Sequence, residues 1–302
     1  MNRQESKTLL PKKIEILKES LDSGFKIRVH DLVMDEARVL FDQLTTEFSA
    51  MSNNPFNQEE LIKRLNHYED ITKPLQTLMM LGCYWGEKEH ERIWVKCLEL
   101  IANLPSESGE DIWIKLRLYP ALLLLYSGGI AAIAGERYRT FRALLTKAWL
   151  IDERKELPVV LGLNIPRIME PNEARKLPGM QNHKTPLSDY LFNFLRESFK
   201  DFLPQDFLYQ IYFDKFEYLS SLVYVDLNKK EVGPKEWGPI GCFGWRRIGQ
   251  RENTIMEKIN LEIENDREKW PPLKAGLFNG SLERFTKVKQ AFDTFIADLN
   301  WY

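Results

Sequence analysis

Apolar residues recur at three- and four-residue spacings through the first half of the chain, which is the period of amphipathic helices. The clearest apolar stripe lies in residues 31–50 and consists of Val33, Ala37, Leu40, Phe41, Leu44 and Phe48. Asn57 and Glu60 have the spacing of a capping box, so a helix should begin there. We expect Pro74 in the first turn of the next helix, where its missing N–H costs nothing, and a break in the chain at Gly86.

Residues 118–134, LYPALLLLYSGGIAAIA, form the most apolar segment of the chain. The segment is about long enough to be considered as a membrane span, but it contains Pro120 and a Gly-Gly pair. We therefore expect a helix buried at the centre of the protein, kinked or divided by Pro120. Residues 128–148 have the pattern of a helical hairpin that turns at Gly135, similar to one tetratricopeptide (TPR) unit. No second copy follows at a fixed period, so the pattern does not indicate a solenoid.

The pattern changes after residue 150, because residues 151–186 contain five prolines and favour irregular loops over long helices. Within this stretch, VVLGL at residues 159–163 is the best candidate for a short strand. Later segments with helical periodicity are 187–202, 206–227, 253–269 and 281–299. The sequence thus predicts an all-α or nearly all-α fold with a helical domain at 1–150, a Pro-rich connection at 151–186 and a second helical part at 187–302. We expect the second part to pack on the first.

The composition is that of a folded protein, with 44% hydrophobic and 28% charged residues. A formal net charge of −2 argues against a nucleic acid as the partner of the whole chain. The three cysteines are too few and too scattered for a disulfide framework. The N-terminal residues lack the apolar core of a signal peptide, so we expect a soluble, cytoplasmic protein that is not bound to a membrane.

Sequence motifs for catalysis are missing. No two of the four histidines have metal-ligand spacing, and the chain contains neither a nucleophile elbow nor a phosphate-binding glycine loop. Pairs of carboxylates occur on helices with charged neighbours, which is typical of solvated faces. We therefore predict no catalytic residue, no metal site and no cofactor.

Two groups of residues are candidates for binding. The first is the glycine-rich loop at residues 231–249, whose rings and arginines suit stacking and the recognition of phosphate or carboxylate: Trp237, Phe243, Trp245, Arg246 and Arg247. In the alternative interpretation, the rings pack against the helical body and hold the loop to it. Cys242 lies in the same loop, where nearby arginines can lower a thiol pKa, although a small buried residue is the favoured interpretation. The second group is Arg139 and Arg142, which would share one helix face. The default interpretation of this face is a solvated surface without a binding role.

Residues 116–148, LRLYPALLLLYSGGIAAIAGERYRTFRALLTKA, resemble a segment of the helical regions of bacterial anti-phage defence proteins. The strings FDKFEYLSSLVYVDL, WGPIGCFGWRR and WPPLKAGLFNGSLERF look like the continuation of the same region. In those proteins the helical region follows an effector module of sirtuin-like or TIR-like type, which we do not expect in this chain. The resemblance implies a recognition, regulatory or assembly role and provides no catalytic residue.

The favoured hypothesis is a non-enzymatic helical module that binds a protein partner or trigger, within a bacterial anti-phage (antiviral) defence system. One alternative is an enzyme whose site is assembled around residues 237–247. Another alternative is a helical scaffold without a ligand. The sequence leaves oligomerisation open.

Overall fold

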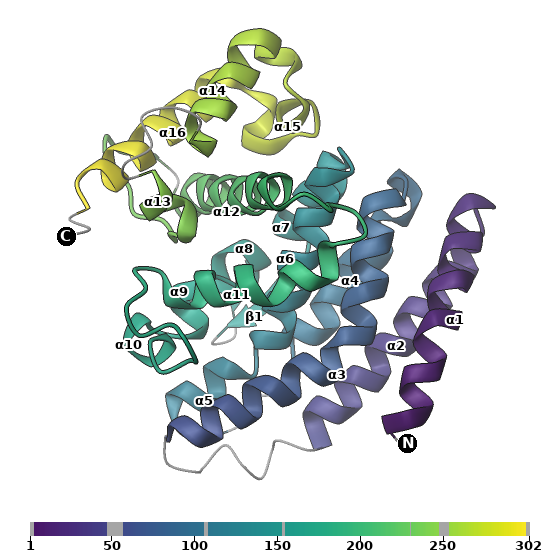
Figure 1. Ribbon diagram of the computed structural model, residues 1–302. Coiled ribbons are helices and arrows are strands. Elements are labelled where there is room, and N and C mark those ends of the chain that lie inside the picture. Colours follow the sequence, from purple (N-terminus) through teal and green to yellow (C-terminus); the bar gives the residue numbers. More distant parts are fainter. Residues whose placement is uncertain are drawn as a thin grey trace. The chain divides into compact units, whose positions relative to one another are not determined.

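The computed structural model describes residues 3–46, 57–105, 108–152, 155–229, 231–247 and 254–299, with side chains from residue 9 onward. The all-α prediction is confirmed, because every described element apart from one two-stranded hairpin is a helix (Figure 1). The chain divides into two compact units, Met1–Val159 and Val160–Tyr302.

Unit 1 is a set of packed helices followed by the hairpin. Its α-helices are α1 (Arg3–Asp22), α2 (Lys26–Thr46), α3 (Gln58–Trp85), α4 (Glu91–Ala102), α5 (Asp111–Leu116), α6 (Tyr119–Ala134) and α7 (Tyr138–Thr146), with a 3-10 turn at Lys88–His90. Helix α3 begins as predicted, since the Asn57 side chain accepts a hydrogen bond of 2.7 Å from the Glu60 N–H. Gly86 ends the same helix, also as predicted.

The expected position of Pro74 is wrong, because α3 continues through this residue instead of starting anew. A proline inside a helix removes one backbone hydrogen bond and crowds the preceding turn. Leu75, Leu78 and Met79 are fully buried directly after Pro74, and their packing holds the helix together across it. Tertiary burial therefore outweighs the local preference of proline.

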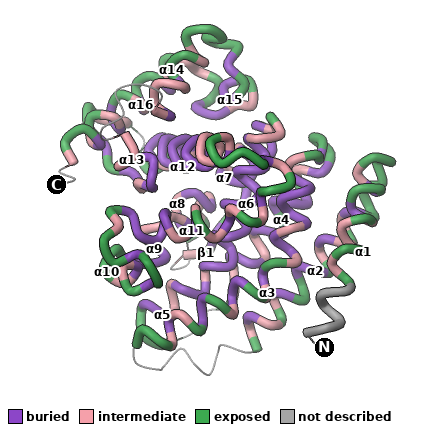
Figure 2. Tube along the Cα trace, in the orientation of Figure 1, coloured by how far each residue is buried: buried purple, intermediate pink, exposed green. Residues whose placement is uncertain are grey.

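Helix α6 forms the core of unit 1. Among the described residues, Asp111–Ala134 is the one segment long and apolar enough to cross a membrane, and 94% of its most apolar window is buried within the protein. Figure 2 shows α6 as a buried stretch. This burial is that of a core helix and agrees with the predicted central helix. The predicted division also occurs, because α5 ends at Leu116 and Pro120 lies in the first turn of α6.

The hairpin turn at Gly135 is confirmed, since Gly135 caps α6 and α7 then packs back against it. The predicted strand at residues 159–163 is wrong. The strands are β1 (Trp149–Asp152) and β2 (Lys155–Pro158), paired antiparallel with Leu150 opposite Leu157, whereas α8 (Val159–Gly162) is a short helix. A short apolar run is compatible with either a buried strand or a buried helical turn, so its periodicity could not decide between them.

Unit 2 is built around one long helix, α12 (Asp206–Asn228). The other α-helices after α8 are α9 (Ile165–Ile168), α10 (Pro171–Ala174), α11 (Pro186–Arg196), α13 (Cys242–Arg246), α14 (Ile255–Asp266), α15 (Pro271–Lys274) and α16 (Leu282–Ala297). Short 3-10 turns lie at Glu197–Phe199, Arg267–Lys269 and Leu277–Gly280. Helices α11, α13, α14 and α16 all contact α12. The four helices predicted after residue 186 are thus confirmed, and the described part of the expected Pro-rich stretch holds most of the hairpin and only short helices before α11.

Candidate functional site

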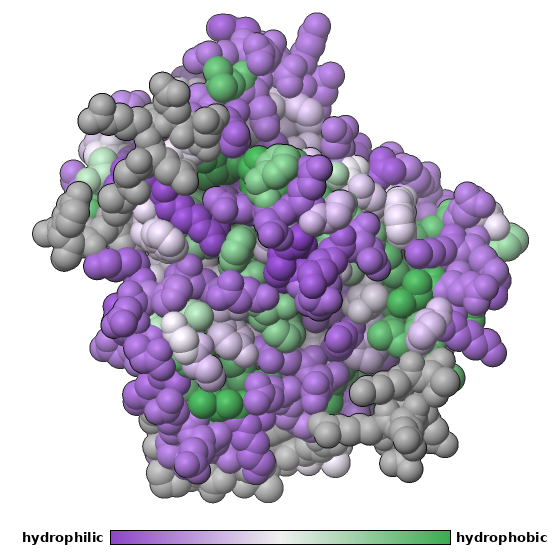
Figure 3. Space-filling model, viewed as in Figure 1, coloured by the Kyte–Doolittle hydropathy of each residue, from purple (hydrophilic) through white to green (hydrophobic). Residues whose placement is uncertain are grey.

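An open apolar groove lies at the turn between α1 and α2 in unit 1. It has a volume of about 770 Å³ and is lined by Ile16, Gly24, Phe25, Lys26, Ile27, Arg28, Asp31 and Leu32. Phe25 is 57% exposed and Ile27 is 78% exposed, so two large apolar side chains face solvent next to each other. In Figure 3 hydrophobic residues gather at the right of the view, on the side where α1 lies. The turn therefore carries an apolar surface that the fold of unit 1 does not cover.

Ile27 and Phe25 are exposed because of their helical positions. The face of α2 that packs into unit 1 carries Val29, Val33, Ala37, Leu40 and Leu44, at three- and four-residue spacings. Ile27 lies outside this stripe, and Phe25 precedes the helix at the turn. Neither side chain is needed for the packing of α2.

The predicted binding residues of the glycine-rich loop differ in their surroundings. Trp237 is 46% exposed and lies edge-on to Tyr224. Phe243 is buried and contacts the rings of Tyr218 and Phe292. Trp245 is half-buried, and its indole N–H has no hydrogen-bond acceptor among the described residues.

The two predicted arginines of α7 belong to unit 1. Arg139 is exposed and Arg142 is half-buried, and neither pairs with a carboxylate in the part of the chain that the structure describes. The structure brings no other predicted binding residue next to them within unit 1. Arg139 and Arg142 thus lie on an accessible helix face without a defined pocket.

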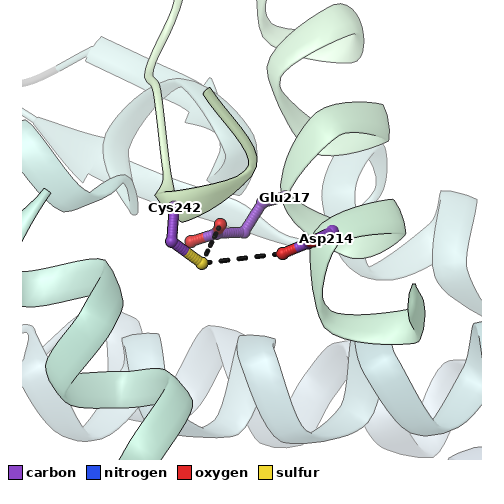
Figure 4. Close-up of side chains that lie close together, drawn as sticks. All are labelled: Asp214, Glu217 and Cys242. Carbon is purple, nitrogen blue, oxygen red and sulfur yellow. Dashed lines mark hydrogen bonds between the residues drawn. The ribbon is translucent and has the colours of Figure 1, made fainter. Parts of the chain in front are cut away.

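Below the glycine-rich loop, a buried polar cluster connects the loop to α12. It consists of Asp214 and Glu217 from α12 and Cys242 from the start of α13, whose potential ligand atoms all lie within 4.8 Å of one another (Figure 4). The Cys242 thiol donates to Glu217 Oε2 at 3.5 Å and to Asp214 Oδ1 at 3.6 Å. Asp214 and Glu217 are three residues apart on one helix, so both carboxylates face the same side.

Ser188 of α11 completes the cluster. Its hydroxyl donates to Glu217 Oε1 at 2.6 Å and accepts from the backbone N–H of Cys242 at 2.8 Å. Gly241 makes this arrangement possible, because a Cβ atom at this position would lie 1.9 Å from Glu217 Oε2. The carboxylate therefore packs directly on the backbone of the loop.

Arg246 provides the positive charge of the cluster. Its guanidinium donates to Asp214 Oδ1 at 2.6 Å and lies over the ring of Phe192 at 4.1 Å. The side chain is only 13% exposed. Its contacts anchor the loop on α12 and α11, through an ion pair and a cation–π contact.

The pKa values of the cluster argue against a reactive thiol. Burial, and then the nearby charges of Glu217 and Asp214, raise the pKa of the Cys242 thiol well above its usual value. The arginine next to it does not reverse this effect, so Cys242 is a protonated hydrogen-bond donor and a poor nucleophile. Burial also raises the pKa of Asp214 to about 6, although the charge of Arg246 acts in the opposite direction.

Asp214, Glu217 and Cys242 are also the residues of the described chain that could hold a metal ion. Their chemistry fits a metal poorly, because Arg246 already neutralises Asp214 and Ser188 donates to Glu217. A cation bound there would lie beside a guanidinium and would have to deprotonate a thiol whose pKa is raised. The arrangement favours a hydrogen-bonded network that holds the loop to α11 and α12.

Comparison with known proteins gives no relative. No protein-family model matches the chain, and no match was found among the curated proteins or the solved structures. The function must therefore be argued from the geometry.

Sequence reasoning missed the carboxylates and Ser188 of the cluster, and it missed the groove. A signal for the cluster was present, since Asp214 and Glu217 are two acidic residues with i, i+3 spacing in a helix otherwise rich in Phe, Tyr and Leu. A signal for the groove was also present, because Phe25 and Ile27 are apolar residues outside the helical stripe of α2. Both signals become meaningful only once the buried faces of the helices are known.

The raised pKa of Asp214 predicts a pH dependence of stability. A carboxyl group that holds its proton more tightly in the folded state makes the protein more stable as the pH falls, between its unfolded pKa near 4 and its folded pKa of about 6. Relative to Asp214→Asn, the wild-type protein should gain about 2–3 kcal/mol between pH 7 and pH 4. Urea denaturation of both proteins across this range measures the difference. Asp201→Asn, at an exposed position without an ion pair among the described residues, is the control. A difference between wild type and Asp214→Asn that stays flat with pH, like that of the control, would contradict the prediction.

Proposed function

We propose that the protein is a non-enzymatic helical module that binds a protein partner, and that the partner docks in the groove at the α1–α2 turn. The observation that carries the proposal is the exposure of Phe25 and Ile27 in an open apolar groove. Contiguous exposed apolar surface on a folded protein typically marks an interaction site. An enzymatic role is less well supported, because the buried cluster around Cys242 satisfies its own hydrogen bonds and keeps its thiol protonated.

The shape of the groove suits an amphipathic helix. Helix-in-groove recognition places apolar residues at i, i+3, i+4 and i+7 of the incoming helix against an apolar trough. Ile16, Phe25, Ile27 and Leu32 provide such a trough between α1 and α2. Fully burying Ile27 alone would contribute about 1.5–3 kcal/mol to association.

The charges at the groove favour acidic residues beside the apolar stripe of the partner. Lys26 and Arg28 line the groove on either side of Ile27. No described carboxylate pairs with Lys26, and Arg28 lies 4.0 Å from an exposed Glu19, which is a weak contact. Asp31, the one acidic residue of the lining, already contacts His30 at 3.0 Å. The partner segment is therefore an amphipathic helix with acidic flanks.

The resemblance of residues 116–148 to helical regions of anti-phage defence proteins supports placing this module in such a bacterial system. In that setting the module acts in the cytoplasm and recognises another protein of the system or a protein trigger. The groove proposal does not depend on this setting and can be tested without it.

We expect that Ile27→Ser weakens partner binding at least about tenfold, because the variant loses most of one buried aliphatic side chain at the interface. The free energy of unfolding should change by less than about 0.5 kcal/mol, since Ile27 is 78% exposed. The probe is a synthetic amphipathic helical peptide with leucines at i, i+3, i+4 and i+7 and flanking glutamates. Fluorescence anisotropy measures its affinity, and a peptide with lysines in place of the glutamates should bind more weakly.

Leu261→Ser is the matched control, because Leu261 is 58% exposed on α14 of unit 2, away from the groove residues in the sequence. This variant should bind the acidic peptide like the wild-type protein. Equal weakening by Ile27→Ser and Leu261→Ser would show non-specific adhesion and overturn the proposal. Equal affinity for the acidic and basic peptides would remove the argument from charge.

A further inference from the structure

A small cavity in unit 2 lies where α12, α13 and α14 meet. Its polar lining consists of Gln210, Asp214, Arg246, Arg247, Thr254 and Lys258. The cavity has a volume of about 30 Å³, which is room for about two water molecules. It is separate from the groove of unit 1 and was not indicated by any sequence motif.

The cavity carries more positive than negative charge. Three of its residues are cations, Arg246, Arg247 and Lys258, and one is an acid, Asp214. Asp214 already forms an ion pair with Arg246 at 2.6 Å. Two positive charges in the lining are therefore without a carboxylate from the lining itself.

The contacts of Arg247 and Lys258 agree with this excess of positive charge in the lining. Among the described residues, Arg247 donates only to main-chain carbonyl oxygens, those of Gly244 at 3.2 Å and Ile296 at 2.6 Å. Lys258 makes no hydrogen bond or ion pair with any residue that the structure describes, although it is half-buried. Two cations that line one small cavity repel each other when the described lining offers them no counter-charge, and an anion between them would remove that repulsion.

The neighbouring groups are suited to an oxyanion. The Thr254 side-chain oxygen accepts from the Glu257 N–H, which leaves its hydroxyl proton free to donate into the cavity. The first turn of α14 begins at the same place, so its dipole adds to the positive potential. Glu257, the acid of this turn, accepts from the Thr254 N–H at 2.9 Å and does not line the cavity.

We propose that this cavity binds a compact oxyanion of phosphate type, held by Arg247, Lys258 and the Thr254 hydroxyl, with Arg246 next to it. Arginine offers a planar fork of N–H donors that matches phosphate oxygens, and lysine adds a mobile ammonium group. The source is either free phosphate or the phosphate group of a small metabolite. The small volume admits only part of the oxyanion, so its remaining oxygens, and the rest of any metabolite that carries it, would remain outside.

Titration calorimetry with inorganic phosphate at constant ionic strength tests the proposal on the full chain. Phosphate should bind the wild-type protein and raise its melting temperature, because a ligand that binds only the folded state stabilises it. Lys258→Met keeps the length of the side chain and removes its charge, so it should weaken phosphate binding at least about tenfold. Without phosphate its melting temperature should be equal to or higher than that of the wild type, since one repelling cation is gone.

Lys274→Met is the matched control, because Lys274 is an exposed lysine of α15 that does not line the cavity. This variant should bind phosphate like the wild-type protein. Ribose 5-phosphate separates the two sources: tighter binding than inorganic phosphate indicates a metabolite, whereas equal or weaker binding indicates the free ion. An equal response of wild type and Lys258→Met to phosphate would overturn the proposal, because the general salting effect of phosphate does not depend on Lys258. Failure of this test would leave the groove of unit 1 unaffected.

Discussion

Leu123→Asn is expected to destabilise the protein by about 4–6 kcal/mol, which is comparable to the whole stability of many domains. Leu123 is fully buried in α6, the core helix of unit 1. The substitution removes a buried aliphatic side chain and leaves a cavity, which costs about 2–5 kcal/mol. It also introduces an amide into apolar surroundings, and an unsatisfied amide adds about 1–3 kcal/mol. Soluble yield and the urea midpoint of unfolding measure the effect.

Val39→Asn provides the comparison for this variant. Val39 is 46% exposed on α2 of the same unit, and valine and asparagine have similar helix propensities. The control should therefore change the stability by about 0.5 kcal/mol or less. A Leu123→Asn protein as stable as Val39→Asn would contradict the burial of α6. Extraction of the wild-type protein only with detergent would indicate that α6 lies in lipid.

The helices were predictable because their apolar residues follow the helical period over long segments. The stripe of Val33, Ala37, Leu40 and Leu44 is the buried face of α2, as its spacing indicates. The continuation of α3 through Pro74 was not predictable in the same way, because it depends on burial by other parts of the chain. The helical turn at Val159–Gly162 was not predictable either, because a run of four or five apolar residues has no period of its own.

The candidate sites were less predictable, since they depend on which side chains the fold brings together or leaves uncovered. The sequence drew attention to Arg246 and Cys242 but could not show that Ser188 and Glu217 meet them from two other helices. Likewise, no local pattern shows that Lys258 lines the same cavity as Arg247 without a partner among the described residues. The proposed recognition role of Trp237 and Trp245 stays a prediction, and so does that of Arg139 and Arg142.

Gly241→Ala should destabilise unit 2 by about 3–5 kcal/mol, although alanine is compatible with the backbone angles at this position (φ −98°). The new Cβ atom would lie 1.9–2.2 Å from the three terminal atoms of the Glu217 carboxyl group. The carboxylate is buried and held by Ser188 at 2.6 Å, so it cannot move aside without leaving its hydrogen bonds. Breaking a buried polar network at one member costs more than the lost contact alone, because the other members lose their partners.

A double-mutant cycle with Glu217→Ala identifies the cause of this cost. Glu217→Ala alone should also destabilise, because the Ser188 hydroxyl loses its acceptor and the Cys242 thiol loses one of its two. In the double variant the alanine at position 241 no longer meets a carboxylate. The destabilisation of the double variant should therefore be smaller than the sum of the two single destabilisations, by at least about 1–2 kcal/mol. The pair Gly241→Ala and Glu264→Ala, with an exposed glutamate of α14, should be additive within about 0.5 kcal/mol. Additive destabilisation by Gly241→Ala and Glu217→Ala would mean that Glu217 does not pack on the loop backbone. Some contact other than this carboxylate would then have to hold the loop to α12.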